Sequence, residues 1–404
     1  MSIFGAMNTA VSGLNAQSAA FGNISDNVAN STTIGYKEVG TSFSDYLTTS
    51  TAQLNDPGSV VATPDYENTL QGTVTQTSTA TNLAVSGQGF FAVSQATSET
   101  NGTATFSPQQ LYTRAGDFSM NKDGYLVNSS GDFLNGWPVD ANGVASQNSL
   151  APIQVTQTST VPHPTTEVTL SANLPASPAT SPITSTVNVY DHLGTEQQLN
   201  LSWAQTSTNN WNLTTTDSNA TDKPVVTQVA FNPATGAITT PASGAVSLTC
   251  NFSGTSQAIN LKLGSLTQYA GTQYTAQGVT QDGVPPGAYT NTTIQPNGDV
   301  VANYDNGQTV TIAQVPLITF NDPNALQSQN GQAYTATQAS GTAVVDQENT
   351  AGAGNLVTSA VESSNVDIGT EFTKLIVAQQ AYSANAKMVT TANQLLQTTI
   401  DMKQ

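Results

Sequence analysis

The sequence predicts a mainly β protein whose two ends are α-helices. Apolar residues recur every seven positions at both ends of the 404-residue chain, and no glycine or proline occurs from Thr370 to Gln404. The residues between the ends form short alternating runs that are separated by Asn-Gly, Asp-Gly and proline-containing turns, which is typical of β-strands. Similar runs precede and follow a proline-rich middle. This arrangement indicates two nested β-domains, inner and outer, each sandwich-like or barrel-like and bracketed by heptad helices.

The first helix is predicted over residues 2 to about 29. One column of residues spaced by seven consists of Met7, Leu14, Phe21 and Val28. A matching column, offset by three residues, contains Ile3, Ala10, Gln17 and Ile24. Because Gly5, Gly13 and Gly22 lie inside this helix, its intrinsic helix propensity is low. We therefore expect a helix that depends on a partner for its order.

The second helix is predicted within residues 365–404, with Ser363, Ser364 and Asn365 as candidate N-caps. Its main apolar column consists of Ile368, Leu375, Tyr382, Val389 and Leu396. Phe372, Ala386 and Ile400 belong to a second register, so the two registers together form a coiled-coil seam or a one-sided helix. Either the two terminal helices pair within the chain, or they pack against copies of themselves in a polymer. The second alternative makes the nine residues of the two main columns the predicted subunit-assembly site.

The composition indicates a surface that is polar but poor in charge. Only 8% of the residues are charged, against about a quarter in an average protein. The net charge of -18 comes from 26 acidic and 8 basic residues, and Asp26 is the one charged residue before Lys37. Because no basic patch is available to neutralise phosphates, nucleic acid is not an expected partner.

Cysteine content, hydropathy and charge indicate whether the chain contains a disulfide bond, a membrane-spanning helix or a cleaved secretory signal. The single cysteine, Cys250, excludes an internal disulfide bond. No apolar run approaches the roughly 20 residues of a membrane-spanning helix. No basic region precedes the first helix, since the first Lys or Arg is Lys37, so we do not expect a cleaved secretory signal.

Turn and strand signals divide the chain into segments. Residues 37–70 are predicted to be an extended linker with a turn at Asp56-Pro57-Gly58. The full predicted division is a helical assembly domain at 1–36 and 362–404, the linker at 37–70, an inner β-domain at 71–148 and 284–361, and an outer β-domain at 149–283. In the outer domain, Asp191-His192-Leu193-Gly194 is a predicted hairpin turn.

Arg114 is the one arginine of the chain. It lies in Tyr112-Thr113-Arg114-Ala115-Gly116-Asp117-Phe118, shortly before a predicted hairpin whose tip is Lys122-Asp123-Gly124. Two interpretations remain open. Arg114 forms a structural ion pair within the hairpin region, with Asp117 as a candidate partner, or it contacts another subunit.

An enzyme is not the expected function. His163 and His192 have no Cys or His at metal-ligand spacing, and no Gly-x-Ser-x-Gly nucleophile elbow occurs. Asp65 and Glu67 are close in sequence but lie in the predicted linker, which does not suit a pair of facing catalytic carboxylates. We predict no catalytic, cofactor-binding or metal-ligating residue and no cofactor.

Several motifs resemble those of flagellar rod and hook proteins. The segment that ends the first helix matches their N-terminal signature through Asn27, Asn30, Thr33, Gly35, Tyr36 and Lys37. The inner-domain motifs are Gly87-x-Gly89-Phe90-Phe91, the Arg114 segment, Asp123-Gly124-Tyr125-Leu126-Val127 and Leu134-x-Gly136-Trp137, and residues 362–367 begin the C-terminal signature. The resemblance covers both ends and both halves of the inner domain. The extra middle domain favours a hook protein over a rod protein.

The resemblance implies a structural subunit that polymerises into a flexible hollow tube and transmits torque from rod to filament. It also implies an extracellular location in the flagellar hook, no membrane insertion, and export through the flagellar type III apparatus. The implied partners are further copies of the chain, the distal rod protein, the hook cap protein and the hook–filament junction protein. A distal rod protein of the same family and a secreted β-domain adhesin are the alternative functions.

Overall fold

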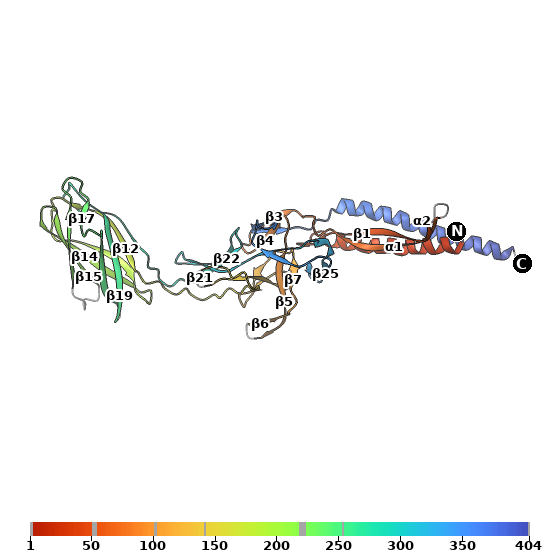
Figure 1. Ribbon diagram of the computed structural model, residues 1–404, viewed down its shortest axis with the longest axis horizontal. Helices are drawn as coiled ribbons and strands as arrows, with labels where there is room; N and C mark the ends of the chain where they lie inside the picture. The colour runs from red at the N-terminus through yellow and green to blue at the C-terminus, as the bar shows by residue number, and fades with distance from the viewer. Residues whose placement is uncertain are drawn as a thin grey trace. The chain divides into compact units, whose positions relative to one another are not determined.

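The computed structural model describes residues 3–50, 55–100, 103–140, 143–217, 224–252 and 254–402 of the chain. The chain forms two compact units. The larger unit consists of Met1–Thr156, Thr292–Ala302 and Val310–Gln404, and the smaller unit consists of Gln157–Asn291 and Asn303–Thr309. A mainly β fold with a helix at each end, as predicted, is confirmed (Figure 1).

Two helices, α1 (Ile3–Ala29) and α2 (Ile368–Asp401), lie side by side in the larger unit (Figure 1). They are antiparallel, because Asn27 contacts Glu371 whereas Phe21 contacts Tyr382. The N-cap of α2 is Asp367 rather than the predicted Ser363, Ser364 or Asn365. Its carboxylate accepts a hydrogen bond from the Thr370 N–H at 2.7 Å, and this bond holds the pKa of Asp367 below its usual value.

Residues 37–70 are not a linker, because most of them form a long antiparallel hairpin. Its strands are β1 (Val39–Ser50) and β2 (Asn55–Tyr66), and Val39 pairs with Tyr66 at its base. The hairpin packs on α1: the Val60 N–H donates to Ser12 Oγ at 3.1 Å, and Asn23 Nδ2 donates to the Gly40 carbonyl at 3.0 Å. The predicted turn at residues 56–58 lies inside β2, where Pro57 occupies a register shift that tolerates its missing N–H.

The β-domain of the larger unit joins early and late parts of the chain. Its early strands are β3 (Val74–Gln76), β4 (Leu83–Ser86), β5 (Phe91–Thr100), β6 (Thr103–Phe106), β7 (Leu111–Thr113), β8 (Ser119–Met120), β9 (Leu126–Val127), β10 (Asp132–Pro138) and β11 (Ala151–Pro152). Its late elements are β22 (Asp299–Tyr304), β23 (Thr309–Gln314), β24 (Leu317–Thr319), the 3-10 turn η1 (Pro323–Ala325), β25 (Gln327–Gln329), β26 (Ala333–Thr335), β27 (Val344–Asp346), β28 (Asn355–Thr358) and β29 (Ala360–Glu362).

Pairing between early and late strands holds this domain together. Strand β28 pairs with β4, β29 with β3, β26 with β7 and β23 with β10. The shared core includes Phe91, Phe118 and Leu134 from the early part and Leu317 and Leu356 from the late part. Because both parts are needed to bury these side chains, the middle of the chain is an insertion into one domain.

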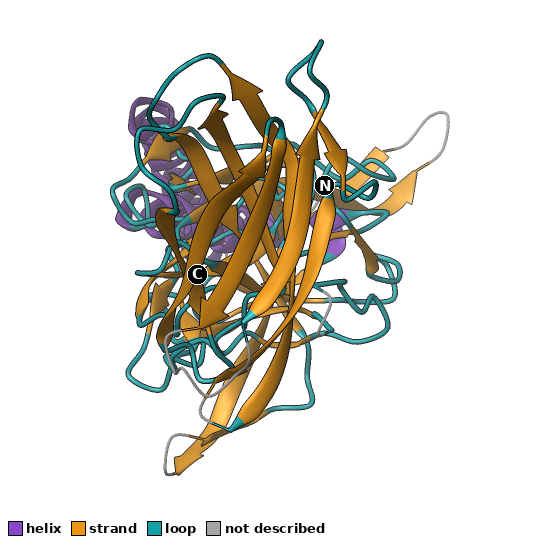
Figure 2. Ribbon diagram, turned by 90° about the vertical axis from the view of Figure 1, so that its left-hand side faces the viewer, coloured by secondary structure: helices purple, strands orange, loops and turns teal. Residues whose placement is uncertain are grey.

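The smaller unit contains two sheets around one core (Figure 2). One sheet has the order β18-β19-β12-β20 and the other β13-β14-β15-β16-β17. Their bounds are β12 (Glu167–Pro175), β13 (Ile183–Tyr190), β14 (Glu196–Ser207), β15 (Asn210–Asp217), β16 (Val225–Phe231), β17 (Ile238–Thr240), β18 (Ala245–Phe252), β19 (Thr255–Tyr269) and β20 (Thr275–Gln281); β21 (Tyr289–Ile294) leads out of this unit. Trp203 and Trp211 are fully buried between the sheets, so the unit is a sandwich.

Local contacts explain where the smaller unit begins and ends. The sequence places the outer domain at 149–283, whereas this unit starts at Gln157 and runs to Asn291. Residues 151–153 stay with the larger unit because β11 pairs with β10 and Ile153 joins its core. Val284 stays with the smaller unit because it pairs with His163.

Candidate assembly site at the terminal helices

The signature segment fastens the end of α1 to the rest of the larger unit. The buried amide of Asn27 accepts a hydrogen bond from the Val39 N–H at 3.0 Å and donates to the Val39 carbonyl at 3.1 Å. Its Nδ2 also donates to Glu371 Oε2 at 3.0 Å. One side chain therefore joins α1, the hairpin β1–β2 and α2.

The remaining signature residues shape the turn that follows α1. Thr33 donates through Oγ1 to Asn30 Oδ1 at 3.1 Å, and Asn30 donates to the Asp26 carbonyl at 2.9 Å. Gly35 has a φ of +71°, and a Cβ on it would lie 2.4 Å from the Ala115 nitrogen. Only glycine fits at this position, because both the dihedral angle and the space exclude a side chain.

Lys37, the last signature residue, belongs to a buried ion cluster. Its Nζ lies 2.6 Å from Glu362 Oε1 and donates to the Leu70 carbonyl at 2.6 Å. Glu362 Oε2 lies 3.0 Å from Arg114 Nη1, and all three side chains are at most 3% exposed. Burial lowers the pKa of Lys37, and the adjacent Glu362 opposes that effect.

Arg114 therefore has a structural partner, but it is Glu362 and not Asp117. Its Nη2 also donates to the Gly87 carbonyl at 2.8 Å, and its guanidinium lies 5.1 Å from the centre of the Phe90 ring. Asp117 instead accepts from the Ser129 N–H at 3.2 Å. Glu362 is 248 positions from Arg114 in sequence, so no local pattern could have indicated this pair.

A second polar cluster joins α2 to the start of the hairpin. Lys374 Nζ lies 2.7 Å from Glu371 Oε1 and also pairs with Glu38. Burial alone would lower the pKa of Lys374, but its hydrogen bonds to Glu371 and Glu38 outweigh burial and raise that pKa. Burial, together with the negative charges of Asp26, Glu371 and Glu38, raises the pKa of Tyr36 to about 12.

Small and polar residues, together with Ile24, form most of the contact between α1 and α2. We call the buried residues on the facing sides of these helices the inner seams: Ala10, Gly13, Ala20, Ile24 and Asn27 on α1, and Glu371, Ala378 and Ala392 on α2, together with the half-buried Asn385. Gly13 permits a close approach, since a Cβ on it would lie 2.7 Å from Asn385 Nδ2. The sequence predicted neither inner seam as the main column, because alanine, glycine and polar residues are weak signals of a packed face.

The nine predicted assembly residues lie beside the inner seams. Met7, Leu14, Phe21, Val28, Leu375, Val389 and Leu396 are half-buried. Ile368 and Tyr382 are exposed, although the Tyr382 ring lies 6.1 Å from that of Phe21. The structure thus brings some of these residues together within one chain, and their role in assembly stays a prediction.

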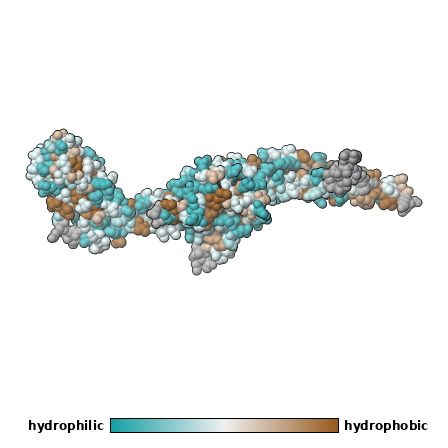
Figure 3. Space-filling view, viewed as in Figure 1, coloured by the Kyte–Doolittle hydropathy of each residue, from teal (hydrophilic) through white to brown (hydrophobic). Residues whose placement is uncertain are grey.

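Other large apolar residues of the helices face solvent. They are Phe4 and Val11 on α1 and Phe372, Ile376, Val377, Met388, Leu395, Ile400 and Met402 on α2. Figure 3 shows apolar residues at the surface of the helical part of the larger unit. A folded protein rarely leaves so much apolar surface uncovered, so these faces indicate an interaction site.

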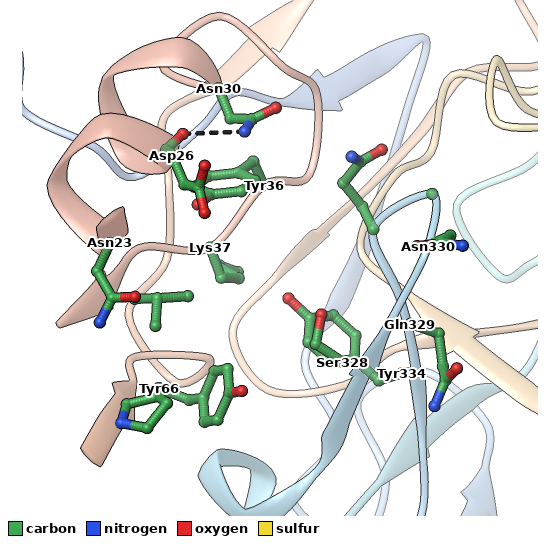
Figure 4. A pocket seen from close by; sticks show the side chains of 14 residues that line it. Asn23, Asp26, Asn30, Tyr36, Lys37, Tyr66, Ser328, Gln329, Asn330 and Tyr334 are labelled. Atoms are coloured by element: carbon green, nitrogen blue, oxygen red, sulfur yellow. Dashed lines mark hydrogen bonds between the residues drawn. The ribbon is translucent and has the colours of Figure 1, made fainter. Parts of the chain in front are cut away.

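Two cavities border the site. One, of about 480 Å³, is lined mainly by amide and tyrosine side chains, among them Asn23, Tyr36, Tyr66 and Tyr334 (Figure 4). The other, of about 460 Å³, lies among α1, α2 and β1 and is lined by Phe43, Val377 and Ala381 among others.

In the described ranges, no group of three or more His, Cys, Asp or Glu side chains could hold a metal ion. No helix in the described part of the chain is long and apolar enough to cross a membrane.

Four family models match the chain in order. They are the flagella basal body rod protein (residues 7–37), the flagellar hook protein FlgE/F/G D1 domain (84–173), the flagellar basal body protein FlaE D2 domain (154–284) and the flagellar basal body rod FlgEFG protein C-terminal domain (357–402). The first match contains the signature segment and most of α1, and the last match contains α2.

Full-length relatives decide the family. The chain is 32% identical over 411 residues to the flagellar hook protein FlgE of Brucella suis biovar 1 (strain 1330), with 100% of both chains covered. The chain belongs to the flagellar hook protein FlgE family. FlgE of Escherichia coli (strain K12) is 31% identical to it, with 98% of this chain and 100% of the relative covered. FlgE of Rhizobium meliloti (strain 1021) is 32% identical, with both chains fully covered.

A solved structure of the FlgE family supports the fold. The crystal structure of Helicobacter pylori flagellar hook protein FlgE2 matches with a TM-score of 0.50 at 13% sequence identity. The match covers 70% of this chain and 98% of that chain. At this identity the likeness concerns the multi-domain β fold alone.

Proposed function

We propose that this FlgE-family chain is a structural subunit of the bacterial flagellar hook and assembles through its terminal helices into a flexible hollow tube. The observation that carries the assembly is the exposed apolar surface of α1 and α2, which one chain leaves uncovered. Membership of the FlgE family supports the hook as the place of assembly.

Two sets of buried polar contacts make this subunit suitable for transmitting torque. Torque that reaches the helices must pass to the β-domain of the same unit. The Lys37–Glu362–Arg114 cluster crosses that junction, the Asn27–Glu371 hydrogen bond joins the two helices to each other, and both are buried. Buried charge-assisted contacts resist separation because breaking one leaves an uncompensated charge. The charge-poor surface, in turn, offers few strong pairs that would have to break when neighbouring subunits slide.

The remaining parts of the proposal rest on the family. The distal rod protein, the hook cap protein and the hook–filament junction protein are the proposed partners besides further copies of the chain. Export through the flagellar type III apparatus to an extracellular location in the flagellum is proposed with them. A chain with one cysteine, and so without an internal disulfide bond, suits export in an unfolded state.

The test is polymerisation of the purified chain. We expect the wild-type protein to form tubes that sediment and are visible by negative-stain electron microscopy. Leu375→Asp and Leu396→Asp should not form tubes, because each places a charge in the half-buried apolar column of α2. Circular dichroism should show that the β-domains of both variants remain folded. Normal tubes from both variants, or no tubes from the wild-type chain under any condition that supports a relative's assembly, would contradict the proposal.

A further inference from the structure

A threonine and a glutamine meet where the chain enters and leaves the sandwich of the smaller unit. Thr165 lies just before β12, the first strand of the sandwich, and Gln281 is the last residue of β20, the last strand. The two strands pair antiparallel, with Val168 opposite Gln281. Thr165 Oγ1 lies 3.2 Å from Gln281 Oε1, although the two residues are 116 positions apart in the sequence. A covalent bond between them would therefore close the whole sandwich.

Neighbouring groups fix the polarity of this contact. The Tyr190 N–H donates to Thr165 Oγ1 at 2.8 Å, so the hydroxyl hydrogen is left to donate to Gln281 Oε1. The Gly283 N–H also donates to Gln281 Oε1, and a backbone N–H can only donate. The oxygen of the glutamine carboxamide therefore faces the threonine.

The threonine side of the contact is closely packed. Thr165 is fully buried. A Cβ on Gly283 would lie 2.1 Å from Thr165 Oγ1 and 2.9 Å from Gln281 Oε1, so only glycine leaves room for both groups. Gln257 Nε2 donates to the Thr165 carbonyl at 2.7 Å and to the Tyr190 carbonyl at 3.0 Å, which fixes the backbone around the hydroxyl. The hydroxyl is thus held against the carboxamide oxygen and shielded from water.

The glutamine side of the contact is more open. Gln281 is half-buried, and it lines a cavity of about 220 Å³ together with Thr280 and Asp282. A small molecule released at the Gln281 side chain can therefore reach solvent while the buried hydroxyl stays in place.

We propose that Thr165 and Gln281 form an ester bond after the smaller unit has folded. Thr165 Oγ1 attacks Cδ of the Gln281 carboxamide, so that an O–C bond forms and the Cδ–Nε2 bond breaks. The hydroxyl proton ends on Nε2, and the nitrogen leaves as ammonia. Nothing is oxidised or reduced, and no cofactor or second substrate is required. The inference concerns the smaller unit and goes beyond the proposed function, which depends on the terminal helices.

Two features accelerate this step, which is otherwise very slow because a carboxamide is a weak electrophile. Holding the hydroxyl at the carboxamide replaces a bimolecular encounter, and a well-oriented pair corresponds to an effective concentration of about 10⁵–10⁸ M. The Gly283 N–H donates to the oxygen that becomes negative in the tetrahedral intermediate, and one such donor contributes about 10²–10³ in rate. Because the bond has to form only once in each chain, a reaction that takes hours or days is sufficient.

The ester bond would change how the smaller unit bears force. Thr165 precedes and Gln281 ends the set of strands from β12 to β20. Tension on the chain at the two ends of the sandwich would pass through the ester bond, so the sheets between them would not be pulled apart. A cross-link also restricts the unfolded chain, which favours the folded state.

Intact mass spectrometry of the purified full-length chain tests the proposal. Thr165→Val removes the nucleophile, and Gln281→Glu replaces the carboxamide by a carboxylate, which is a far poorer electrophile. Thr166→Val, at the adjacent and exposed threonine, is the control. Each folded protein is incubated at neutral pH and then denatured, and its mass is compared with the mass calculated from its sequence. Tandem mass spectrometry of a digest locates any cross-link.

We expect the wild-type chain and Thr166→Val to be lighter by the mass of one ammonia molecule, with Thr165 and Gln281 in one cross-linked peptide pair. The cross-linked fraction should be lower by a factor of about ten or more in Thr165→Val and in Gln281→Glu. Should Thr165→Val fail to fold, Gln281→Glu provides the same comparison. A folded wild-type chain that keeps its full mass would overturn the inference. A loss of ammonia that persists in both variants would also overturn it, because the ammonia would then come from another amide.

Discussion

Glu362 shows how much of the larger unit depends on single buried groups. Its carboxylate pairs with Lys37 and Arg114 and accepts from the Gly72 N–H at 2.8 Å, while its backbone carbonyl accepts from the Gly35 N–H. The two cations come from different segments of the early part of the unit, and the carboxylate comes from the last strand, β29. Glu362 thus connects the signature segment, the β-domain and the segment that leads into α2.

Glu362→Gln tests this role. The substitution keeps the shape but leaves two buried cations without their counter-ion, so we expect the larger unit to lose about 3–5 kcal/mol of unfolding free energy. Urea denaturation followed by far-UV circular dichroism measures the change. Asp45→Asn removes a carboxylate on the exposed side of β1 and is the matched control, which should behave like the wild type. A variant as stable as its control would show that the cluster does not stabilise the fold.

Because the pKa of Tyr36 is raised, we predict that the free energy of unfolding depends on pH in the alkaline range. The folded chain holds the Tyr36 proton up to a pKa of about 12, whereas the unfolded chain releases it near pH 10. Between these values the folded state binds more protons, so the free energy of unfolding falls as pH rises through this window. Tyr36→Phe should flatten that fall between pH 10 and 12. Tyr46→Phe, at an exposed ring on the hairpin, is the control and should retain the wild-type slope.

Among the elements, α1 contains glycines with different roles. A Cβ on Gly22 would meet no atom within 4 Å, whereas a Cβ on Gly13 would meet Asn385 at the contact with α2. Gly22 is therefore replaceable in the folded monomer, and Gly13 lets the two helices approach. The sequence alone predicts only that both weaken the helix.

Gly22→Ala should stabilise the monomer by roughly 0.5–1 kcal/mol, because alanine has the higher helix propensity and nothing opposes its methyl group. Gly13→Ala should gain clearly less, since the new methyl group displaces the Asn385 amide. Thermal unfolding of the two variants in parallel measures the difference. Equal stabilisation would show that α1 and α2 are not closely packed at this position.

At the scale of the whole molecule, the two units have separate cores. Trp203 and Trp211 lie in the core of the smaller unit, and Trp137 is buried in the larger one. Trp137→Phe therefore leaves a chain whose tryptophan fluorescence reports on the smaller unit alone. Units with independent cores generally unfold in separate transitions.

We expect Glu362→Gln, added to Trp137→Phe, to move the circular-dichroism transition of the larger unit to lower urea and to leave the fluorescence midpoint unchanged. The comparison is between the single variant Trp137→Phe and the double variant, both measured in the same urea series. An equal shift of both signals would mean that the chain unfolds as one cooperative unit.

Local patterns in the sequence were sufficient for the two helices and for the turn between β13 and β14. Seven-residue spacing predicted α1 and α2, and Asp191–Gly194 predicted the turn between β13 and β14, where Gly194 has a φ of +74°. These predictions succeed because helix periodicity and turn conformation depend on residues that are close in sequence. The alternating pattern in residues 38–66 is weak, and for that reason it does not reveal the hairpin.

The sequence by itself determined the mainly β fold, the terminal helices and the signature motifs by which the chain resembles its family. Only the tertiary structure decided which face of each helix is buried, because the inner seams consist of residues such as Gly13 and Ala378 whose small size matters only when a partner is close. It also decided the partner of Arg114. Lys37, Arg114 and Glu362 are far apart in the chain, and they meet because pairing between early and late strands closes the domain around them.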